Sequence, residues 1–200
     1  MSRLPICLLM LACGAAQAGG TLFAGAGSRS GGSAERQPGG NITLHPENTQ
    51  SVSLGSATSG ELLLDLAINA DSAYQLWVSH SRHSLQPLSS GEMRVSHAQI
   101  GGINFYPDAS SGLRPFVAGG IGASQIEVED LPARLYPSFS LAGGLDIPLG
   151  KLLTARLEAR ISAVAVTSEY RIYCSGGCSA QINAGLWTQW GGSALLGFRF

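Results

Sequence analysis

Residues 188–200 alternate between apolar and polar side chains with a period of two, and this pattern constrains the fold more than any other feature. Successive side chains of a strand point to opposite faces, so every second residue shares a face. One face would carry the apolar residues Trp190, Ala194, Leu196, Phe198 and Phe200. The other would carry the polar residues Gln189, Ser193 and Arg199. We therefore predict a C-terminal β-strand with one apolar and one polar face.

The first 18 residues have the pattern of a secretion signal. Arg3 supplies a positive start, residues 4–12 are mostly apolar but too few to span a bilayer, and Ala16-Gln17-Ala18 is a small-x-small cleavage pattern. We expect cleavage after Ala18 and a single mature domain over residues 19–200. The alternative is a lipoprotein signal with Cys13 lipidated, although the residues before it match that signal poorly. No later window is apolar enough for a helical membrane span.

The composition of the chain is poor in charge. Only 12% of the residues are charged, whereas a soluble domain usually carries about 25%. Charged side chains are unfavourable on a wall that faces lipid, so the low fraction of charged residues favours a membrane protein. The formal net charge of −1 gives no attraction for nucleic acid or an anionic surface, and we expect no nucleic-acid partner.

Two internal segments, residues 61–69 and 153–163, show the same alternation most clearly. A helix is the alternative interpretation of the second segment, because its leucine and isoleucine residues also recur every four positions. The strict alternation of charged and apolar side chains favours a strand. With weaker patterns elsewhere, we predict strands over residues 21–28, 61–69, 73–82, 94–106, 113–125, 138–147, 152–164 and about 187–200.

The connections between these strands alternate in length. Three are short and would be turns: residues 70–72, 107–112 and 148–151. Four are longer and polar: residues 29–60, 83–93, 126–137 and 165–186. Short turns on one side, long loops on the other and strands of about ten residues are typical of barrels that cross a bilayer. The sequence predicts an all-β fold, an eight-stranded antiparallel up-and-down transmembrane β-barrel.

Four glycine-rich or aromatic segments support a family resemblance: residues 100–107, 113–123, 139–147 and 195–200. The chain resembles the small eight-stranded outer-membrane β-barrel proteins of Gram-negative bacteria, the OmpA/OmpW/OmpX-like barrel-domain superfamily. The resemblance implies a monomer in the cell outer membrane, surrounded by its lipid and lipopolysaccharide. It also implies insertion by the barrel-assembly machinery, with Phe198 and Phe200 as the assembly signal. Leu195 departs from the pattern, which usually has glycine five residues before the terminal Phe.

The polar faces of the predicted strands collect charged residues. If these faces point inward, the lumen holds Glu61, Asp65, Asp146, Arg156, Glu158, Arg160 and Arg199. Charges of alternating sign in a narrow space should pair with one another and plug the lumen. The alternatives are a gated pore or proton path, and a carboxylate pair that performs acid–base chemistry.

One segment, residues 79–84, raises the possibility of an enzyme, because it contains two His among three Ser. A serine nucleophile needs a His within hydrogen-bond reach and a carboxylate behind it. Barrels that deacylate lipid A carry a His-x-Ser pattern, which places both side chains on one strand face. Here Arg82 stands two residues after His80, so that pattern fails, although His97 and Ser79 could meet across strands. We expect no enzymatic activity, with lipid A acyl-chain modification as the alternative.

Two cysteines remain after the signal, Cys174 and Cys178, on either side of a Gly-rich turn. In an exported chain such a pair predicts a disulfide. A metal site would need two more ligands, and none is close in sequence, so we expect no metal and no cofactor. The expected role is structural, or binding of an extracellular ligand through the outer loops. A narrow pore and a soluble, lipocalin-like periplasmic lipid carrier are further alternatives.

Overall fold

The computed structural model describes residues 19–30, 53–86, 92–108, 110–128, 132–166, 170–173, 179–182 and 185–200. The expected signal segment 1–18 and the cysteine pair Cys174 and Cys178 lie outside the described residues. Every regular element within these ranges is a strand. No helix of the described residues is long and apolar enough to cross a membrane.

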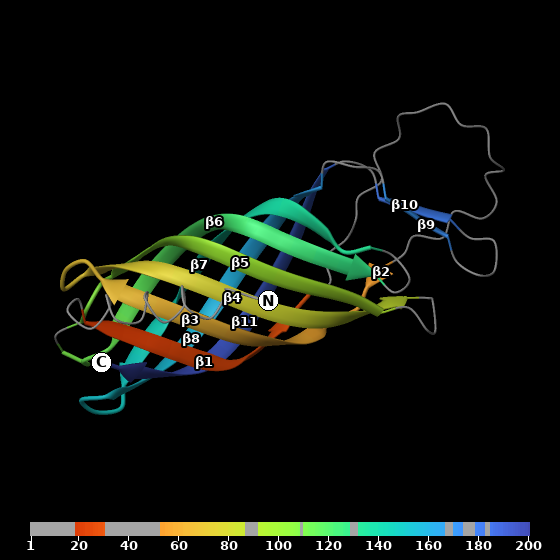
Figure 1. Cartoon of the computed structure of the whole chain (residues 1–200). Helices are drawn as coiled ribbons and strands as arrows, with labels where there is room; N and C mark the ends of the chain where they lie inside the picture. The colour runs from red at the N-terminus through yellow and green to blue at the C-terminus, as the bar shows by residue number, and fades with distance from the viewer. Residues whose placement is uncertain are drawn as a thin grey trace, which may run out of the picture.

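Eight long strands form the body of the molecule (Figure 1). They are β1 (Gly20–Arg29), β3 (Ala57–Ala67), β4 (Ser72–Gln86), β5 (Glu92–Phe105), β6 (Arg114–Val128), β7 (Arg134–Pro148), β8 (Leu153–Val166) and β11 (Gly185–Arg199). The short strand β2 (Ser53–Leu54) pairs with β4. The strands β9 (Tyr170–Tyr173) and β10 (Ser179–Ile182) form a two-stranded sheet of their own. The predicted eight-stranded barrel is confirmed.

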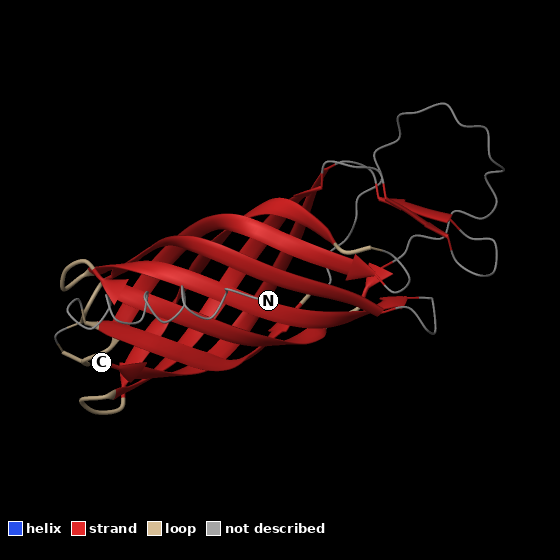
Figure 2. Ribbon diagram, viewed as in Figure 1, coloured by secondary structure: helices blue, strands red, loops and turns tan. Residues whose placement is uncertain are grey.

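The eight strands close into a barrel (Figure 2). Each is antiparallel to both neighbours; β1 pairs with β11 and with β3, and the pairing of β4 with β5 completes the ring. The stagger can be followed by starting at Ser81 on β4 and passing from each residue to its partner on the next strand. After all eight strands this path returns to β4 beside Asp71, ten residues before Ser81. This stagger tilts the strands and brings residues far apart in sequence to one level of the lumen.

The two ends of the barrel differ. At one end, here the turn end, lie the short connections 68–71, 106–113 and 149–152 (tan at the left of Figure 2). At this end Gly20 N donates to Phe200 O at 2.9 Å and Phe200 N donates to Gly20 O at 3.0 Å, which joins the first strand to the last. The remaining four connections leave from the opposite end, here the loop end.

Two of the loops predicted to be long are short. Residues 83–93 and 126–137 were expected to be loops, but the strands on both sides continue, leaving connections of only 87–91 and 129–133. The ladder continues through polar pairs such as Arg82 with Arg94. On β5 and β6 the alternation inverts at this level: Arg94 and Glu127 point outward, while Val95 and Ile126 are buried inside. The apolar-outside pattern that located the strands therefore ends there.

The wall is apolar on its outer face and mostly polar inside. Exposed side chains on the outer face include Leu62, Tyr74, Ile121, Leu141 and Trp190. This confirms the predicted orientation of the strands. It is the opposite of the arrangement in a soluble lipid carrier, whose outer face would have to be polar.

The interior is built in three layers. At the turn end lies an apolar cluster of Ala73, Ile103, Phe105, Phe116, Ala118 and Ala142. The middle is charged and polar, with a smaller apolar cluster of Phe23, Leu63, Trp77 and Leu195. Toward the loop end many inward positions are again apolar and buried, namely Met93, Val95, Ile126, Val164, Val166 and Trp187, although the buried polar residues His83 and Ser81 are paired with Met93 and Val95.

Candidate functional site

Arg156 is the centre of the ion pairs nearest the turn end. Its Nε and Nη2 donate to the two carboxylate oxygens of Asp146 at 2.6 and 2.9 Å, and Nη2 also donates to Asp65 at 2.7 Å. Its guanidinium lies over the rings of Phe23 and Phe116, at 4.0 and 4.5 Å from the ring centroids. A fully buried arginine is thus neutralised by two carboxylates and packed between aromatic rings.

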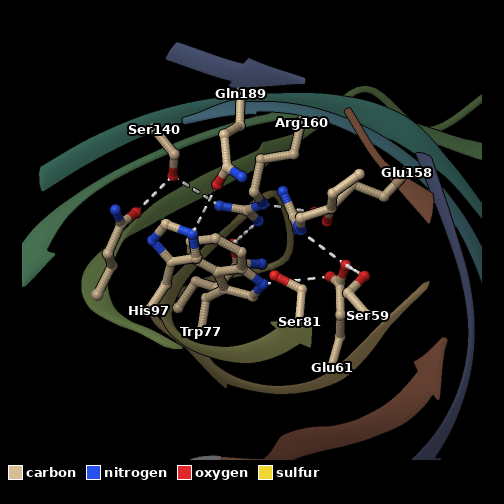
Figure 3. A network of polar contacts seen from close by, with 12 residues as sticks. Ser59, Glu61, Trp77, Ser81, His97, Ser140, Glu158, Arg160 and Gln189 are labelled. Atoms are coloured by element: carbon tan, nitrogen blue, oxygen red, sulfur yellow. Dashed lines mark hydrogen bonds and ion pairs between the residues drawn. The ribbon is translucent and has the colours of Figure 1, made fainter. Parts of the chain in front are cut away.

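Arg160 is the centre of a second group, closer to the loop end (Figure 3). Its Nε donates to Glu158 at 2.6 Å, Nη1 to Ser140 at 2.9 Å and Nη2 to Gln75 at 2.9 Å. The guanidinium lies 4.4 Å from the ring centroid of Trp77. Along the ring of strands, β8, which carries Arg160, and β4, which carries Gln75, are diametrically opposite. This contact therefore crosses the full width of the lumen.

Glu61 is the centre of a third group. It accepts hydrogen bonds from Arg29 at 2.8 Å, from Ser59 at 3.1 Å and from the indole N–H of Trp77 at 3.2 Å (Figure 3 shows the last two residues). Six of the seven predicted lumen charges are therefore buried in ion pairs with one another or with Arg29.

Arg199 was predicted to belong to this network, and that prediction is wrong. Arg199 is half-buried at the turn end and makes no ion pair with any described residue. Arg29 takes its place, although the predicted first strand stopped one residue before it. The missed signal is the alternation itself, because Arg29 continues the inward positions that begin at Phe23.

Two histidines are linked through Gln189 across the lumen, on the loop-end side of the ion pairs. His97 Nδ1 lies 2.6 Å from Ser124 Oγ and its Nε2 lies 3.2 Å from Gln189 Oε1. The amide nitrogen of Gln189 lies 3.2 Å from His83 Nε2, and His83 Nδ1 lies 2.9 Å from the carbonyl oxygen of Gly55. The carbonyl must accept, so His83 carries its proton on Nδ1; Gln189 then donates to His83 and accepts from Nε2–H of His97.

Ser79 and His97, which were predicted to meet across strands, are paired in the sheet but form no hydrogen bond with each other. The two residues are directly opposite on β4 and β5 and both are buried. His97 instead stacks on Trp77, with ring centroids 5.2 Å apart, and Ser79 Oγ has no hydrogen-bond partner among the described residues. A serine–histidine pair forms elsewhere: on the outer face, His80 Nδ1 lies 2.9 Å from Ser96 Oγ. In the part of the chain that is described, no carboxylate hydrogen-bonds to His80.

The remaining residues singled out in the sequence lie on the outer face or in an apolar cluster of the lumen. Phe198 and Phe200 lie exposed on the outer face near the turn end. Leu195 points into the lumen, where it belongs to the apolar cluster with Phe23, Leu63 and Trp77. Within the described ranges, no group of three or more His, Cys, Asp or Glu side chains is arranged to hold a metal ion.

Comparison with solved structures identifies the fold. The crystal structure of Neisserial surface protein A superposes with a TM-score of 0.58 at 11% identity, covering 91% of this chain and 96% of that one. OprG, an outer membrane protein of Pseudomonas aeruginosa, gives 0.57 at 11% identity, with 92% and 96% covered. The outer membrane protein AlkL gives 0.52 at 14% identity, with 91% and 89% covered. No protein-family model and no curated protein sequence matches the chain.

Proposed function

We propose that this protein, which has the fold of the small eight-stranded outer-membrane barrels, is a non-conducting and non-enzymatic barrel. It would hold its loops at the cell surface, in a structural role or to bind an extracellular ligand. The observation that carries the proposal is the closed lumen, where side chains from opposite walls bond to each other between two apolar layers.

Three contacts cross the lumen in the middle layer. Arg160 on β8 reaches Gln75 on the opposite strand β4, and His97 on β5 reaches Gln189 on the opposite strand β11. Arg156 on β8 reaches Asp65 on β3, three strands away along the ring. Each of these side chains is itself held by further hydrogen bonds, so they support a permanent plug rather than a passage for water or ions.

The apolar layer at the turn end and the apolar side chains toward the loop end strengthen the seal. An ion that entered from the turn end would have to leave water before it met a buried polar group, and that desolvation is costly. The layer at the turn end contains two phenylalanine rings, Phe105 and Phe116, in edge-to-face contact with centroids 6.3 Å apart. The sealed lumen leaves the outer loops and the outer wall as the surfaces that can act on other molecules.

Two experiments test the proposal. Purified protein in planar bilayers should give no discrete conductance steps above the background of empty bilayers. An epitope inserted between Gly39 and Gly40, in the connection from β1 to β3, should be detected by antibody on intact cells, because in outer-membrane barrels the longer loops face outward. Steady single-channel currents, or an epitope reached only after cell lysis, would contradict it.

The surroundings of the barrel follow from the same proposal. It would be delivered with a cleaved signal, inserted by the barrel-assembly machinery and surrounded as a monomer by outer-membrane lipid and lipopolysaccharide. Folded barrels migrate differently in electrophoresis before and after boiling, so heat modifiability of the outer-membrane fraction tests both the location and the folding of the protein.

A lipid A acyl-chain enzyme is the second candidate, and one observation favours it. Ser96 and His80 form an exposed pair on the outer face, where an ester of a membrane lipid could reach them. It ranks second because no described carboxylate hydrogen-bonds to His80, as a triad requires. If it is correct, the lipid A mass spectrum of a deletion strain will change. The wild-type gene will then restore it, and Ser96→Ala will not.

A further inference from the structure

The apolar band on the outer wall differs in length from strand to strand. On β4 it consists of Tyr74, Leu76 and Val78, and the next outward residues on either side, Ser72 and His80, are polar. On β8, by contrast, every outward residue between positions 153 and 165 is Leu, Ile or Ala. A strand that crosses a bilayer at about 45° needs roughly 9–11 residues. The apolar run on β4 is shorter than this, and the run on β8 is longer.

The inclination of the strands determines how these two runs lie relative to each other. The stagger of ten residues corresponds to a strand tilt of roughly 45°, so each residue advances about 2.4 Å along the barrel axis and about as far around the wall. About twelve residues therefore carry a strand from one side of the barrel to the opposite side. In Figure 2 the strands of the front and back walls cross for this reason. Since β4 and β8 are opposite in the ring, the loop end of each lies on the same side as the turn end of the other.

The apolar band lies at different heights on these two sides. On one side, here the high side, it runs from Tyr74 on β4 to Ala165 on β8; on the other, here the low side, it runs from Leu153 on β8 to Val78 on β4. From β4 through β3, β1 and β11 to β8, each step to a paired residue descends about 3 Å toward the turn end. Ala165 is therefore roughly 12 Å nearer the loop end than Val78. Likewise, Tyr74 is roughly 7 Å nearer the loop end than Leu153.

The neighbouring strands show the same shift of both edges. Toward the loop end, polar Ser28 on β1 and Thr58 on β3 end the band on the low side, whereas Leu135 on β7 and Leu186 on β11 still belong to it on the high side. Toward the turn end, polar Asn104 on β5 ends the band on the high side. The height of the band is about 20 Å on both sides. The band is thus displaced as a whole, as in a cylinder that is inclined to the bilayer.

A flat bilayer favours an inclined barrel over an upright one. An upright barrel would hold Leu135 and Leu186 in water, or Ser28 and Thr58 in hydrocarbon, and both exposed apolar area and desolvated polar groups are costly. Inclining the loop end toward the high side lowers that side and lifts the other until the two edges are level. A shift of roughly 10 Å across a barrel about 20 Å wide corresponds to an inclination of about 25–30°.

We propose that the barrel axis is inclined by about 25–30° to the membrane normal, with the loop end leaning toward the high side. The loop ends of β7, β8 and β11 then dip into the hydrocarbon, and those of β3, β4 and β5 stand clear of it. This lifted wall carries the ion pairs of Arg82 and Arg94 with Glu92 and Glu127, and it is the strand surface that a molecule in the medium can reach. The inference rests on the proposed location in the outer membrane, but not on the sealed lumen or on the role of the loops.

Four spin labels test the inclination, in two pairs on opposite sides of the barrel. Near the loop end the pair is Ala165→Cys on the high side and Thr58→Cys on the low side. Near the turn end it is Ser72→Cys on the high side and Ala155→Cys on the low side. Each label is attached to the purified barrel with both Cys174→Ser and Cys178→Ser, refolded in dilauroylphosphatidylcholine vesicles. Depth is read from the ratio of collisions with oxygen, which concentrates in hydrocarbon, to collisions with a water-soluble nickel complex.

The inclined and upright barrels predict different ratios. Thr58 is about 5 Å nearer the turn end than Ala165, so in an upright barrel its label would be the deeper of the two. In the inclined barrel, the label at Ala165 should favour oxygen several-fold more than the label at Thr58. The label at Ala155 should likewise favour oxygen several-fold more than that at Ser72. Equal or reversed ratios in either pair would overturn the inference, because a shift at one edge alone means a band of uneven height.

A fifth label separates failure of the inclination from failure of the proposed location. Leu157→Cys, in the middle of the band on β8, should favour oxygen in an upright and in an inclined barrel. If this label met the nickel complex instead, the location in the membrane would be wrong, and the inference with it. If it favours oxygen while the two pairs show no difference, only the inclination is wrong.

The inclination should also respond to the height of the apolar edge. Ser28→Leu combined with Thr58→Leu raises the loop-end edge on the low side, so the label at Ala165 should move toward water and lose about half of its preference for oxygen or more. Thr188→Leu is the matched control, because this outward residue of β11 already lies within the band on the high side, and it should leave the ratio unchanged. An unchanged ratio in the double variant would contradict the inference. Heat-modifiable electrophoresis establishes that each variant is folded.

Discussion

Replacing Arg156 by methionine should strongly destabilise the barrel. The arginine is fully buried and donates three hydrogen bonds of 2.6 to 2.9 Å to Asp65 and Asp146. Methionine leaves two carboxylates in the lumen with no cation between them. Removing one partner of a buried ion pair typically costs about 3–5 kcal/mol, because the remaining charge is neither solvated nor neutralised. We expect a loss of this size in the free energy of unfolding.

The assay is urea unfolding of the barrel refolded in lipid vesicles, followed by tryptophan fluorescence and by heat-modifiable electrophoresis. The matched control is the triple variant Arg156→Met, Asp65→Asn and Asp146→Asn, which removes all three charges at once. It should recover at least half of the loss, because neutral amides in the lumen cost far less than unpaired carboxylates. A loss below about 1 kcal/mol in the single variant, or no recovery in the triple variant, would refute the reasoning.

Three further predictions concern other parts of the molecule. Combining Arg160→Ala with Gln75→Ala removes a contact across the lumen, and should give small, brief currents in planar bilayers where the wild type gives none. Leu195→Ala opens a cavity beside Phe23, Leu63 and Trp77, and should cost about 2–4 kcal/mol by urea unfolding; an unchanged midpoint would contradict the packing. Asp108 lies in an exposed turn, where hydrogen bonds from Ser111 and Ser110 lower its pKa to about 2. Because the folded pKa lies below the ordinary value of 3.8, its contribution should be complete above pH 4 and lost as the pH falls toward 2. Nuclear magnetic resonance titration of the Asp108 carboxyl carbon checks this, and an ordinary pKa would contradict it.

The sequence predicted the wall of the barrel better than its interior. Alternation of side chains locates a strand and its two faces wherever one face is apolar, which is why residues 61–67 and 153–163 were placed correctly, while 68 and 69 belong to the following turn. It fails beyond the apolar wall, where charged residues such as Glu127 point outward and apolar ones such as Ile126 point inward, and so the extensions of β4 to Gln86 and of β6 to Val128 were missed.

The contacts across the lumen could not be predicted from local patterns. Which side chains meet depends on the stagger of ten residues around the ring, and this stagger is a property of the closed barrel. Alternation indicated that Arg160 and Glu61 point inward, but not that Arg160 bonds to Gln75 or that Arg29 bonds to Glu61. The pair of His80 and Ser96 was missed for the same reason, since its members come from two strands.

The seam between the first strand and the last has a consequence for assembly. Arg156 and Arg160 belong to a late strand, while Asp65 and Gln75 belong to early ones, on the other side of the junction of β1 with β11. Before that junction forms, the sheet is open, and the contacts of Arg156 with Asp65 and of Arg160 with Gln75 cannot exist, whereas Arg156 can already pair with Asp146 on the neighbouring strand. Joining β1 to β11 would then expel the water and form the contacts across the lumen in one step, so that the ring and the lumen should close together, with no stable half-closed barrel between them.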